Sequence, residues 1–243
     1  MSRGFQFKQF YVNHEQSAMK VGTDSIVLGS WTQVNGANRI LDIGTGSGLL
    51  ALMMAQRSCA ECAITAIDIE STAVNQATFN FIASKWKKKF SCREVALQDF
   101  STETVFDLII SNPPYFPMRQ FSKNDETTQN QTLARLRARQ QDTLSLAELL
   151  TNVKRLLASN GVFCCVLPSD LDTQFTELAQ EHALAIQRKL SLLPTPDKPP
   201  IRSLWQIGAE AKKLEEQELI IKDETGQYTN SYKTLTKDFY LHF

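Results

Sequence analysis

The sequence predicts an α/β fold with a mostly parallel sheet, and two observations carry this prediction. Short apolar runs alternate with longer segments of helical periodicity, which is the pattern of parallel strands joined by crossover helices. One such run, Arg39-Ile-Leu-Asp-Ile43, ends directly at a glycine-rich stretch, as a strand does when it leads into a tight turn. We therefore expect a seven-stranded, mostly parallel sheet with helices on both faces and an antiparallel C-terminal hairpin.

Each expected element follows from a local pattern. The expected strands are residues 39–43, 63–69, 91–97, 106–110, 161–167, 185–192 and 201–209, and the expected helices are residues 49–57, 71–84, 145–158 and 172–181. Ser71 is placed to cap its helix, and Asn160-Gly161 is a helix-stop signal. The proline-rich residues 194–200 are too few to hold a crossover helix, so the last two strands should run antiparallel.

Length and composition indicate one globular domain over residues 1–243. Of these 243 residues, 42 % are hydrophobic and 21 % are charged, so enough apolar surface exists to offset the entropy of folding. Two stretches fall outside the α/β alternation. We expect residues 1–38 to form an N-terminal extension that covers substrate or cofactor, and residues 116–140 to form a long polar and basic loop.

The sequence favours a cytoplasmic protein without a metal site. It has no window of 18 apolar residues, and its N-terminal segment has no apolar stretch of the signal-peptide type. The five cysteines are an odd number, which fits reduced thiols. Cys59-x-x-Cys62 lacks the second pair of ligands that a zinc site needs, and the three histidines do not cluster. No obligate protein partner is inferred.

The glycine-rich stretch Asp42-Ile-Gly-Thr-Gly-Ser-Gly48 lies between an expected strand and an expected helix. Glycines there allow a tight turn and let a ligand approach the backbone closely. The spacing is Gly-x-Gly-x-Gly, and Leu49 occupies the position of the third glycine of the dinucleotide motif, which disfavours a pyrophosphate cofactor. The alternative interpretation is a turn that only connects strand to helix.

Two further carboxylates follow neighbouring strands. Asp68 ends the second expected strand, where a carboxylate can accept hydrogen bonds from both ribose hydroxyls of a nucleoside. Asp99 follows the third expected strand, where it can meet an adenine edge. This order of motifs resembles the class I S-adenosylmethionine-dependent methyltransferases, which have a Rossmann-like fold. The resemblance implies S-adenosylmethionine as the cofactor.

A stiff motif, Ser111-Asn-Pro-Pro-Tyr115, follows the fourth expected strand. Two successive prolines fix the backbone and hold Asn112 out of the helical region. The alternative interpretation is a stiff turn without a chemical role. The motif resembles motif IV of methyltransferases that act on planar amide or exocyclic amine nitrogens. By this resemblance, the Asn112 side-chain oxygen and the Pro113 carbonyl accept hydrogen bonds from the target amine, and Tyr115 stacks on the target ring.

Two sets of site residues follow from the resemblance. The expected catalytic residues are Asn112, Pro113, Pro114 and Tyr115. The expected cofactor-binding residues are Thr23, Asp42, Gly44, Gly46, Gly48, Asp68, Asp99 and Asn112.

Two terminal segments narrow the choice of substrate. Met19-Lys-Val-Gly-Thr-Asp24 and the closing Tyr232-Lys-Thr-Leu-Thr-Lys-Asp-Phe-Tyr240 are similar to segments of the bacterial enzymes that methylate N6 of adenine 37 in a valine tRNA. The resemblance implies the anticodon stem-loop of a tRNA as partner. Another exocyclic amine or amide stays open as target, namely an rRNA base, a DNA adenine or a release-factor glutamine. A non-catalytic RNA-binding protein with the same fold is the alternative from another class.

Local basic clusters agree with an RNA substrate, although 26 basic and 26 acidic residues cancel over the whole chain. Residues 119–139 carry five basic and two acidic residues, a net charge of +3. Lys85-Trp-Lys-Lys-Lys89 is a second cluster, for which the alternative is a solvated helix end. The residues expected to contact RNA are Lys85, Lys87, Lys88, Arg135, Arg137, Arg139, Lys198 and Arg202.

Overall fold

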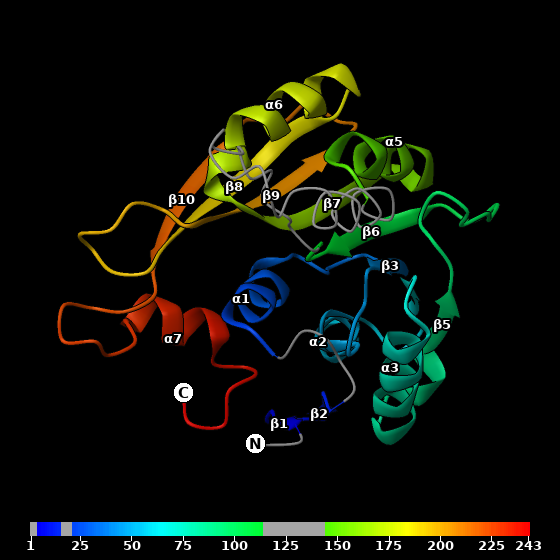
Figure 1. The fold of residues 1–243 in the computed structure, drawn as a ribbon, viewed down its shortest axis with the longest axis horizontal. Coiled ribbons are helices and arrows are strands. Elements are labelled where there is room, and N and C mark those ends of the chain that lie inside the picture. Colours follow the sequence, from blue (N-terminus) through cyan, green and yellow to red (C-terminus); the bar gives the residue numbers. More distant parts are fainter. Residues whose placement is uncertain (1–3, 16–20, 114–143) are drawn as a thin grey trace, which may run out of the picture.

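The computed structural model describes residues 4–15, 21–113 and 144–243, and these residues form an α/β fold around one large sheet (Figure 1). The sheet has eight strands in the order β10-β8-β9-β7-β6-β3-β4-β5. They are β3 (Arg39–Ile43), β4 (Ala63–Asp68), β5 (Phe90–Glu94), β6 (Phe106–Ser111), β7 (Leu157–Pro168), β8 (Ala185–Leu193), β9 (Arg202–Gly208) and β10 (Glu215–Ile220). Neighbours pair in parallel except at β9, which is antiparallel to both β7 and β8. The predicted fold class and the antiparallel pair are confirmed.

Helices cover both faces of this sheet, as predicted. One face carries α1 (Thr23–Trp31), α2 (Leu49–Arg57), α3 (Ser71–Ala83) and α7 (Asn230–Thr236), and the other carries α5 (Leu146–Leu156) and α6 (Asp172–Glu181) (Figure 1). Two short 3-10 helices are η1 (Lys87–Lys89) and η2 (Ser169–Leu171). Successive strand residues alternate between the faces, so Cys164 lies in the core beneath α1 and α2 while Cys165 lies beneath α5 and α6.

The predicted number of seven strands is wrong, because β10 forms an eighth. Its sequence, Glu215-Glu-Gln-Glu-Leu-Ile220, lacks the apolar alternation that marks a half-buried strand, and its first four residues are exposed. Backbone pairing with β8 holds this charged strand at the edge of the sheet, where its charges discourage pairing with other chains.

Two predicted boundaries also differ from the structure. β5 ends at Glu94 rather than at residue 97, and β7 begins at Leu157, inside the segment predicted as helix. Asn160-Gly161 therefore lies within β7 and does not stop α5. The register between β6 and β7 shifts here, and a Cβ on Gly161 would lie 2.7 Å from the Phe106 carbonyl oxygen. Glycine is needed for this close approach of two strands rather than for a helix end.

Side-chain caps hold one helix start and are missing at another. α5 begins with a capping box, in which the Ser145 hydroxyl accepts a hydrogen bond from the Glu148 N–H and the Glu148 carboxylate accepts one from the Ser145 N–H. Ser71, predicted to cap α3, is instead the first residue of that helix. Its N-cap is Glu70, which makes no side-chain capping bond.

The N-terminal residues form a hairpin that the sequence did not predict. β1 (Gly4–Gln6) and β2 (Tyr11–Asn13) pair antiparallel. Phe7 is fully buried and stacks on Phe10, with ring centroids 4.7 Å apart. The Lys8 ammonium donates a hydrogen bond to the Phe243 carbonyl, at 2.9 Å. The hairpin and the C-terminal tail are thus held together on the face that carries α1, α2 and α3 (Figure 1).

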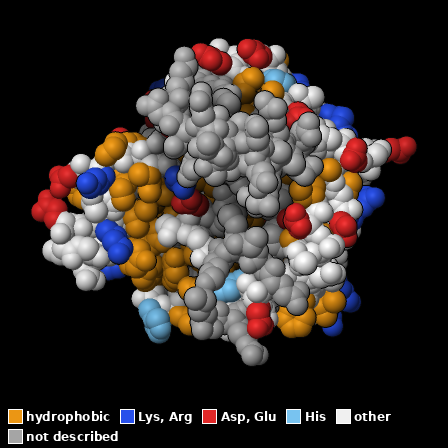
Figure 2. All heavy atoms as spheres, viewed as in Figure 1, with side chains coloured by type: hydrophobic (Ala, Val, Ile, Leu, Met, Phe, Trp, Pro, Cys, Tyr) orange, Lys and Arg blue, Asp and Glu red, His pale blue; other side chains and the backbone are white. Residues whose placement is uncertain are grey.

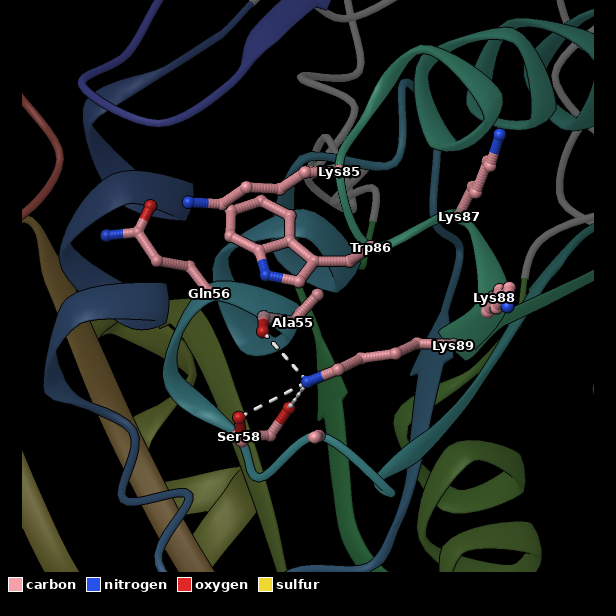
Figure 3. A pocket seen from close by; sticks show the side chains of 9 residues that line it. Ala55, Gln56, Ser58, Lys85, Trp86, Lys87, Lys88 and Lys89 are labelled. Carbon is pink, nitrogen blue, oxygen red and sulfur yellow. Dashed lines mark hydrogen bonds between the residues drawn. The ribbon is translucent and has the colours of Figure 1, made fainter.

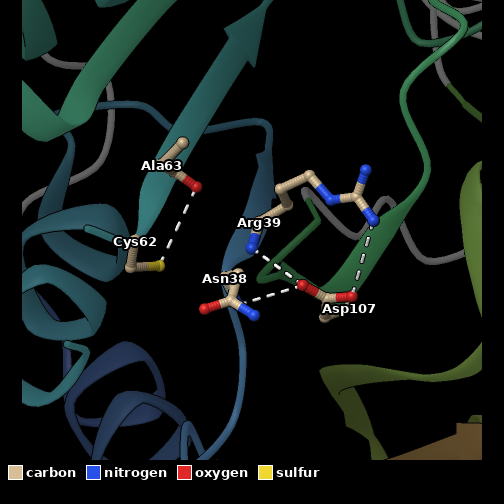
Figure 4. Close-up of polar contacts among 5 residues, drawn as sticks. All are labelled: Asn38, Arg39, Cys62, Ala63 and Asp107. Carbon is tan, nitrogen blue, oxygen red and sulfur yellow. Dashed lines mark hydrogen bonds and ion pairs between the residues drawn. The ribbon is translucent and has the colours of Figure 1, made fainter.

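At the amino ends of β3 and β6, Asp107 ties two segments together (Figure 4). Its Oδ2 accepts hydrogen bonds from the Asn38 and Arg39 N–H groups, each at 2.9 Å. Cys62 is buried close by, and burial raises the pKa of its thiol. These contacts at the amino edge are structural, whereas ligands of open α/β sheets bind at the carboxyl edge.

Candidate active site

The glycine loop between β3 and α2 holds three glycines in conformations that other residues rarely adopt. Gly44, Gly46 and Gly48 have φ angles of 67°, 56° and 80°. A Cβ on Gly48 would collide with the Phe81 ring, at 2.6 Å, whereas a Cβ on Gly44 would meet no atom of the described residues within 4 Å. The loop is therefore packed on α3 at one end and open at the other, where a ligand can approach its backbone.

Asp42 anchors this loop from within β3. Its Oδ2 accepts hydrogen bonds from the Thr45 hydroxyl, at 2.6 Å, and from the Ala51 N–H, at 3.1 Å. The side chain is fully buried, and its Oδ1 has no hydrogen-bond partner within the part of the chain that the structure describes. Burial, with a smaller contribution from the charge of Asp68, raises the pKa of Asp42 to about 7. A cationic ligand group near this oxygen would stabilise the charged form.

Asp68 joins the glycine loop to the end of β4. One carboxylate oxygen accepts a hydrogen bond from the Gly46 N–H, at 2.9 Å, and the other accepts one from the Glu70 N–H, at 3.0 Å. Each oxygen keeps a further lone pair for a donor such as a ribose hydroxyl. The next residue, Ile69, is 52 % exposed and adds an apolar surface beside this carboxylate. The sequence gives no signal for Ile69 at this site, because an isoleucine at the end of an apolar strand is expected in the core.

Asp99 lies farther from its strand than the sequence predicted. β5 ends at Glu94, and Asp99 is exposed in a turn where its N–H donates to the Ala96 carbonyl, at 3.0 Å. The structure thus joins Asp42, the glycine loop and Asp68 by hydrogen bonds, and it shows no such bond from Asp99 to them within the described residues.

Asn112 lies beside the glycine loop because β6 is the neighbour of β3. Ser111, the last residue of β6, pairs with Ile43, and its hydroxyl donates to the Ile43 carbonyl at 2.9 Å. The Asn112 side chain donates from Nδ2 to the Ser25 hydroxyl oxygen, also at 2.9 Å. Asn112 therefore directly follows a residue that the sheet holds, and its side chain is bonded to α1.

Three successive side chains at the start of α1 contact three other segments. Their partners are Tyr232 of α7 for Thr23, Arg202 of β9 for Asp24, and Asn112 for Ser25. Of these three residues the sequence predicts only Thr23 as a site residue, and the Lys-Val-Gly-Thr-Asp block that contains it is the local signal for this turn. Arg202, expected to contact RNA, has an ion-pair partner 2.8 Å away inside the protein.

Asn80 of α3 links the N-terminal hairpin to the glycine loop. Its Nδ2 donates to the carbonyls of Asn13 and Ser47, both at 2.8 Å, and its Oδ1 accepts from the Asn13 N–H, at 3.0 Å. The side chain is 1 % exposed, so these bonds replace those it would make with water. The local sequence gives no signal for this role of Asn80, since its partners are 33 and 67 residues away.

The lysine cluster 85–89 lies at the amino edge of the sheet, where α2 and α3 end (Figure 3). With the end of α2 it lines a cavity of about 450 Å³. Lys89 donates to the Ala55, Ser58 and Cys59 carbonyls at 3.1, 3.2 and 2.6 Å, and so caps α2. Lys85 donates to Gln9 at 2.7 Å, whereas Lys87 and Lys88 are exposed.

The remaining basic residues divide between the carboxyl edge and the undescribed segment. Lys198 is exposed in the loop that joins β8 to β9, beside the start of β9. Figure 2 shows basic side chains beside hydrophobic ones on the side where the loops after β8 and β10 lie. Pro113 is buried, and five predicted residues lie outside the described ranges: Pro114, Tyr115, Arg135, Arg137 and Arg139.

Within residues 4–15, 21–113 and 144–243, no group of three or more His, Cys, Asp or Glu side chains is placed to hold a metal ion. None of the helices in these ranges combines the length and the apolar character needed to cross a membrane.

The fold is shared with solved methyltransferase structures. The chain superimposes on a structure described as a predicted O-methyltransferase from Agrobacterium tumefaciens, with a TM-score of 0.66 and 13 % identity, over 89 % of this chain and 96 % of that one. A ribosomal protein L11 methylase from Lactobacillus delbrueckii subsp. bulgaricus matches with a TM-score of 0.52 and 16 % identity, over 76 % of each chain. At these identities the likeness concerns the fold alone.

Sequence comparison identifies the family. Residues 16–138 match the model of the methyltransferase small domain. A tRNA1(Val) (adenine(37)-N6)-methyltransferase of Pseudoalteromonas atlantica is 41 % identical over 99 % of both chains. The enzyme of the same name from Bacteroides thetaiotaomicron is 41 % identical over 98 % of this chain and 97 % of its own. The chain therefore belongs to the methyltransferase small-domain family and, within it, to the group formed by these tRNA1(Val) (adenine(37)-N6)-methyltransferases.

Proposed function

We propose that this protein methylates the N6 amine of adenine 37 in the anticodon loop of a valine tRNA, with S-adenosylmethionine as methyl donor. The observation that carries the proposal is the position of Asn112, at the end of β6 and directly beside the glycine loop that follows β3. An amide that can accept hydrogen bonds from an amine thus lies next to the loop proposed to bind the cofactor. The names of the full-length relatives support the same reaction.

The residues of the carboxyl edge fit S-adenosylmethionine. Among the described residues, Gly44 has room for a ligand against its backbone, and the buried Oδ1 of Asp42 has no hydrogen-bond partner, so it favours a cation nearby. We assign the ribose hydroxyls to Asp68 and an adenine face to the exposed Ile69. The remaining proposed contacts are Thr23, Gly46, Gly48, Asp99 and Asn112. The cofactor supplies an electrophilic methyl group on a sulfonium.

The protein's part in the reaction is to hold and orient the target nitrogen. The Asn112 side-chain oxygen and the Pro113 carbonyl accept hydrogen bonds from the two N6 hydrogens, which localises the lone pair that is otherwise delocalised into the adenine ring. Tyr115 stacks on the base and, with Pro114, shapes the loop around it. Adenine 37 must leave its stack in the anticodon loop before its amine reaches these groups.

The tRNA contacts are proposed from charge and exposure. Lys198 is exposed at the carboxyl edge, and Lys87 and Lys88 are exposed at the amino edge, so contacts at both edges need a partner large enough to span the sheet. An anticodon stem-loop meets that requirement. We include Lys85, Arg135, Arg137, Arg139 and Arg202 in this surface, and we place the protein in the cytoplasm, where it meets tRNA.

Methyl transfer from radiolabelled S-adenosylmethionine to separate pools tests the function. The pools are bulk tRNA, rRNA, DNA and release factor, each offered to the parental protein and to Asn112→Ala. We expect label in tRNA, recovered as N6-methyladenine at position 37, and a turnover at least about 100-fold lower in the variant. Label in another pool would assign that target instead, and no label in any pool would point to an RNA-binding protein that does not catalyse.

A further inference from the structure

The Asn112 amide has a hydrogen-bond partner that the sequence motifs do not mark. Ser25 lies in the first turn of α1, and its hydroxyl oxygen accepts a hydrogen bond from Asn112 Nδ2, at 2.9 Å, across 87 residues of sequence. Both residues are half-buried at the carboxyl edge.

The two ends of an amide are not equivalent for an amine target. The oxygen accepts hydrogen bonds, whereas the NH₂ group only donates them. An N6 amine also presents hydrogens, so an amide turned by 180° would set donor against donor and could not localise the nitrogen lone pair. In the structure the Ser25 hydroxyl oxygen accepts one NH₂ hydrogen of Asn112, and this leaves Oδ1 on the side away from Ser25.

Ser25 is well held for this task. Its neighbour Asp24 is ion-paired with Arg202 of β9 at 2.8 Å. The residues that follow, Ile26 to Trp31, are buried in the core. Asn112 directly follows Ser111, whose backbone is paired with Ile43 of β3, and its side-chain torsions are a freedom that the bond to Ser25 restricts.

We propose that Ser25 is a positioning residue for methyl transfer: it accepts one hydrogen of the Asn112 NH₂ group and so directs the Asn112 oxygen toward the target amine. The proposal rests on the proposed function, because it requires that Asn112 bind the amine. It assigns to α1 a part in turnover that is separate from cofactor binding.

The test compares Ser25→Ala with Ser25→Thr, which keeps a hydroxyl, and with Ser91→Ala, which removes an exposed serine from β5. We expect Ser25→Ala to lower kcat about tenfold, the equivalent of one orienting hydrogen bond, with KM for tRNA and Kd for S-adenosylmethionine within about twofold of parental. Ser25→Thr should recover most of kcat, and Ser91→Ala should be parental throughout.

A double-mutant cycle separates a positioning role from any other. In an Asn112→Ala background, adding Ser25→Ala should change kcat by less than about twofold, because the group that Ser25 orients is gone. A full tenfold loss in that background, a parental kcat in Ser25→Ala, or a loss confined to Kd for the cofactor would each overturn the proposal. A parental kcat in Asn112→Ala alone would instead overturn the proposed role of Asn112, so the two failures are distinguishable.

Discussion

The Asp24 carboxylate accepts a hydrogen bond from the Arg202 guanidinium over 2.8 Å, although 178 residues separate the two in the chain. The pair joins the first turn of α1 to the start of β9, next to Ser25. Both side chains are about one-third exposed, so solvent screens the pair and its contribution to stability is modest. The pair also connects the turn that carries Ser25 to β9, beside the candidate active site.

We expect a measurable coupling between these two residues. Asp24→Asn, Arg202→Gln and the double variant form a cycle, and urea unfolding should give an interaction free energy of about 0.5 kcal/mol to 1 kcal/mol. Raising the salt concentration should reduce it. Additive effects of the two substitutions would show that Arg202 is not coupled to Asp24 and is available to contact RNA.

Asp68 should control cofactor affinity. Asp68→Ala removes the proposed acceptor of the ribose hydroxyls and also releases the Gly46 N–H, so Kd for S-adenosylmethionine should rise by at least the equivalent of about 2 kcal/mol. Calorimetric titration measures this directly. Glu94→Ala, which removes an exposed carboxylate from the end of the adjacent β5, is the matched control and should bind as the parent does. Equal affinities in the two variants would remove Asp68 from the site.

Asp42 should make the protein less stable as the pH rises. Its pKa is about 7 when folded, against an ordinary value of 3.8, so between about pH 4 and pH 7 the folded protein binds more protons than the unfolded chain. The free energy of unfolding therefore falls across this window, by at most about 1.4 kcal/mol per pH unit from this group. Asp42→Asn keeps an acceptor for Thr45 and Ala51 and removes the titration.

Chemical denaturation of parent and Asp42→Asn at several pH values between 4 and 8 checks this. The stability of the parent relative to the variant should decline as the pH rises and then level above about pH 7. Parallel curves would show that Asp42 is ionised in the folded protein throughout. With saturating S-adenosylmethionine, the free energy of unfolding should fall less between pH 4 and pH 7, because the cation of the cofactor favours the charged form of Asp42.

Lys87 and Lys88 should contribute to RNA binding if the tRNA reaches the amino edge. Replacing both with alanine should flatten the plot of log Kd for tRNA against log salt concentration by about two slope units, and leave cofactor affinity unchanged. Lys212→Ala with Lys213→Ala is the matched control, since these lysines are exposed near the start of β10. The parental salt slope in the Lys87 and Lys88 variant would confine tRNA to the carboxyl edge.

The sequence by itself determined the elements whose signals are local. Adjacent residues suffice to identify three such signals, namely the apolar run 39–43, the glycine spacing after it and Asn112-Pro-Pro-Tyr115. Strand burial, left-handed turns and proline stiffness each act over only a few positions. From these, the parallel sheet and the carboxyl edge as the candidate site could be predicted.

Only the tertiary structure decided which distant residues meet. β10 has no apolar alternation and exists because β8 offers it backbone partners. Lys85–Lys89 lies at the amino edge because α3 carries the chain across the sheet before the lysines begin. Ser25 orients Asn112, and Asn80 ties the N-terminal hairpin to the glycine loop, through hydrogen bonds that span 87 and 67 residues. Such bonds leave no local pattern, since their geometry is set by packing of whole helices on the sheet.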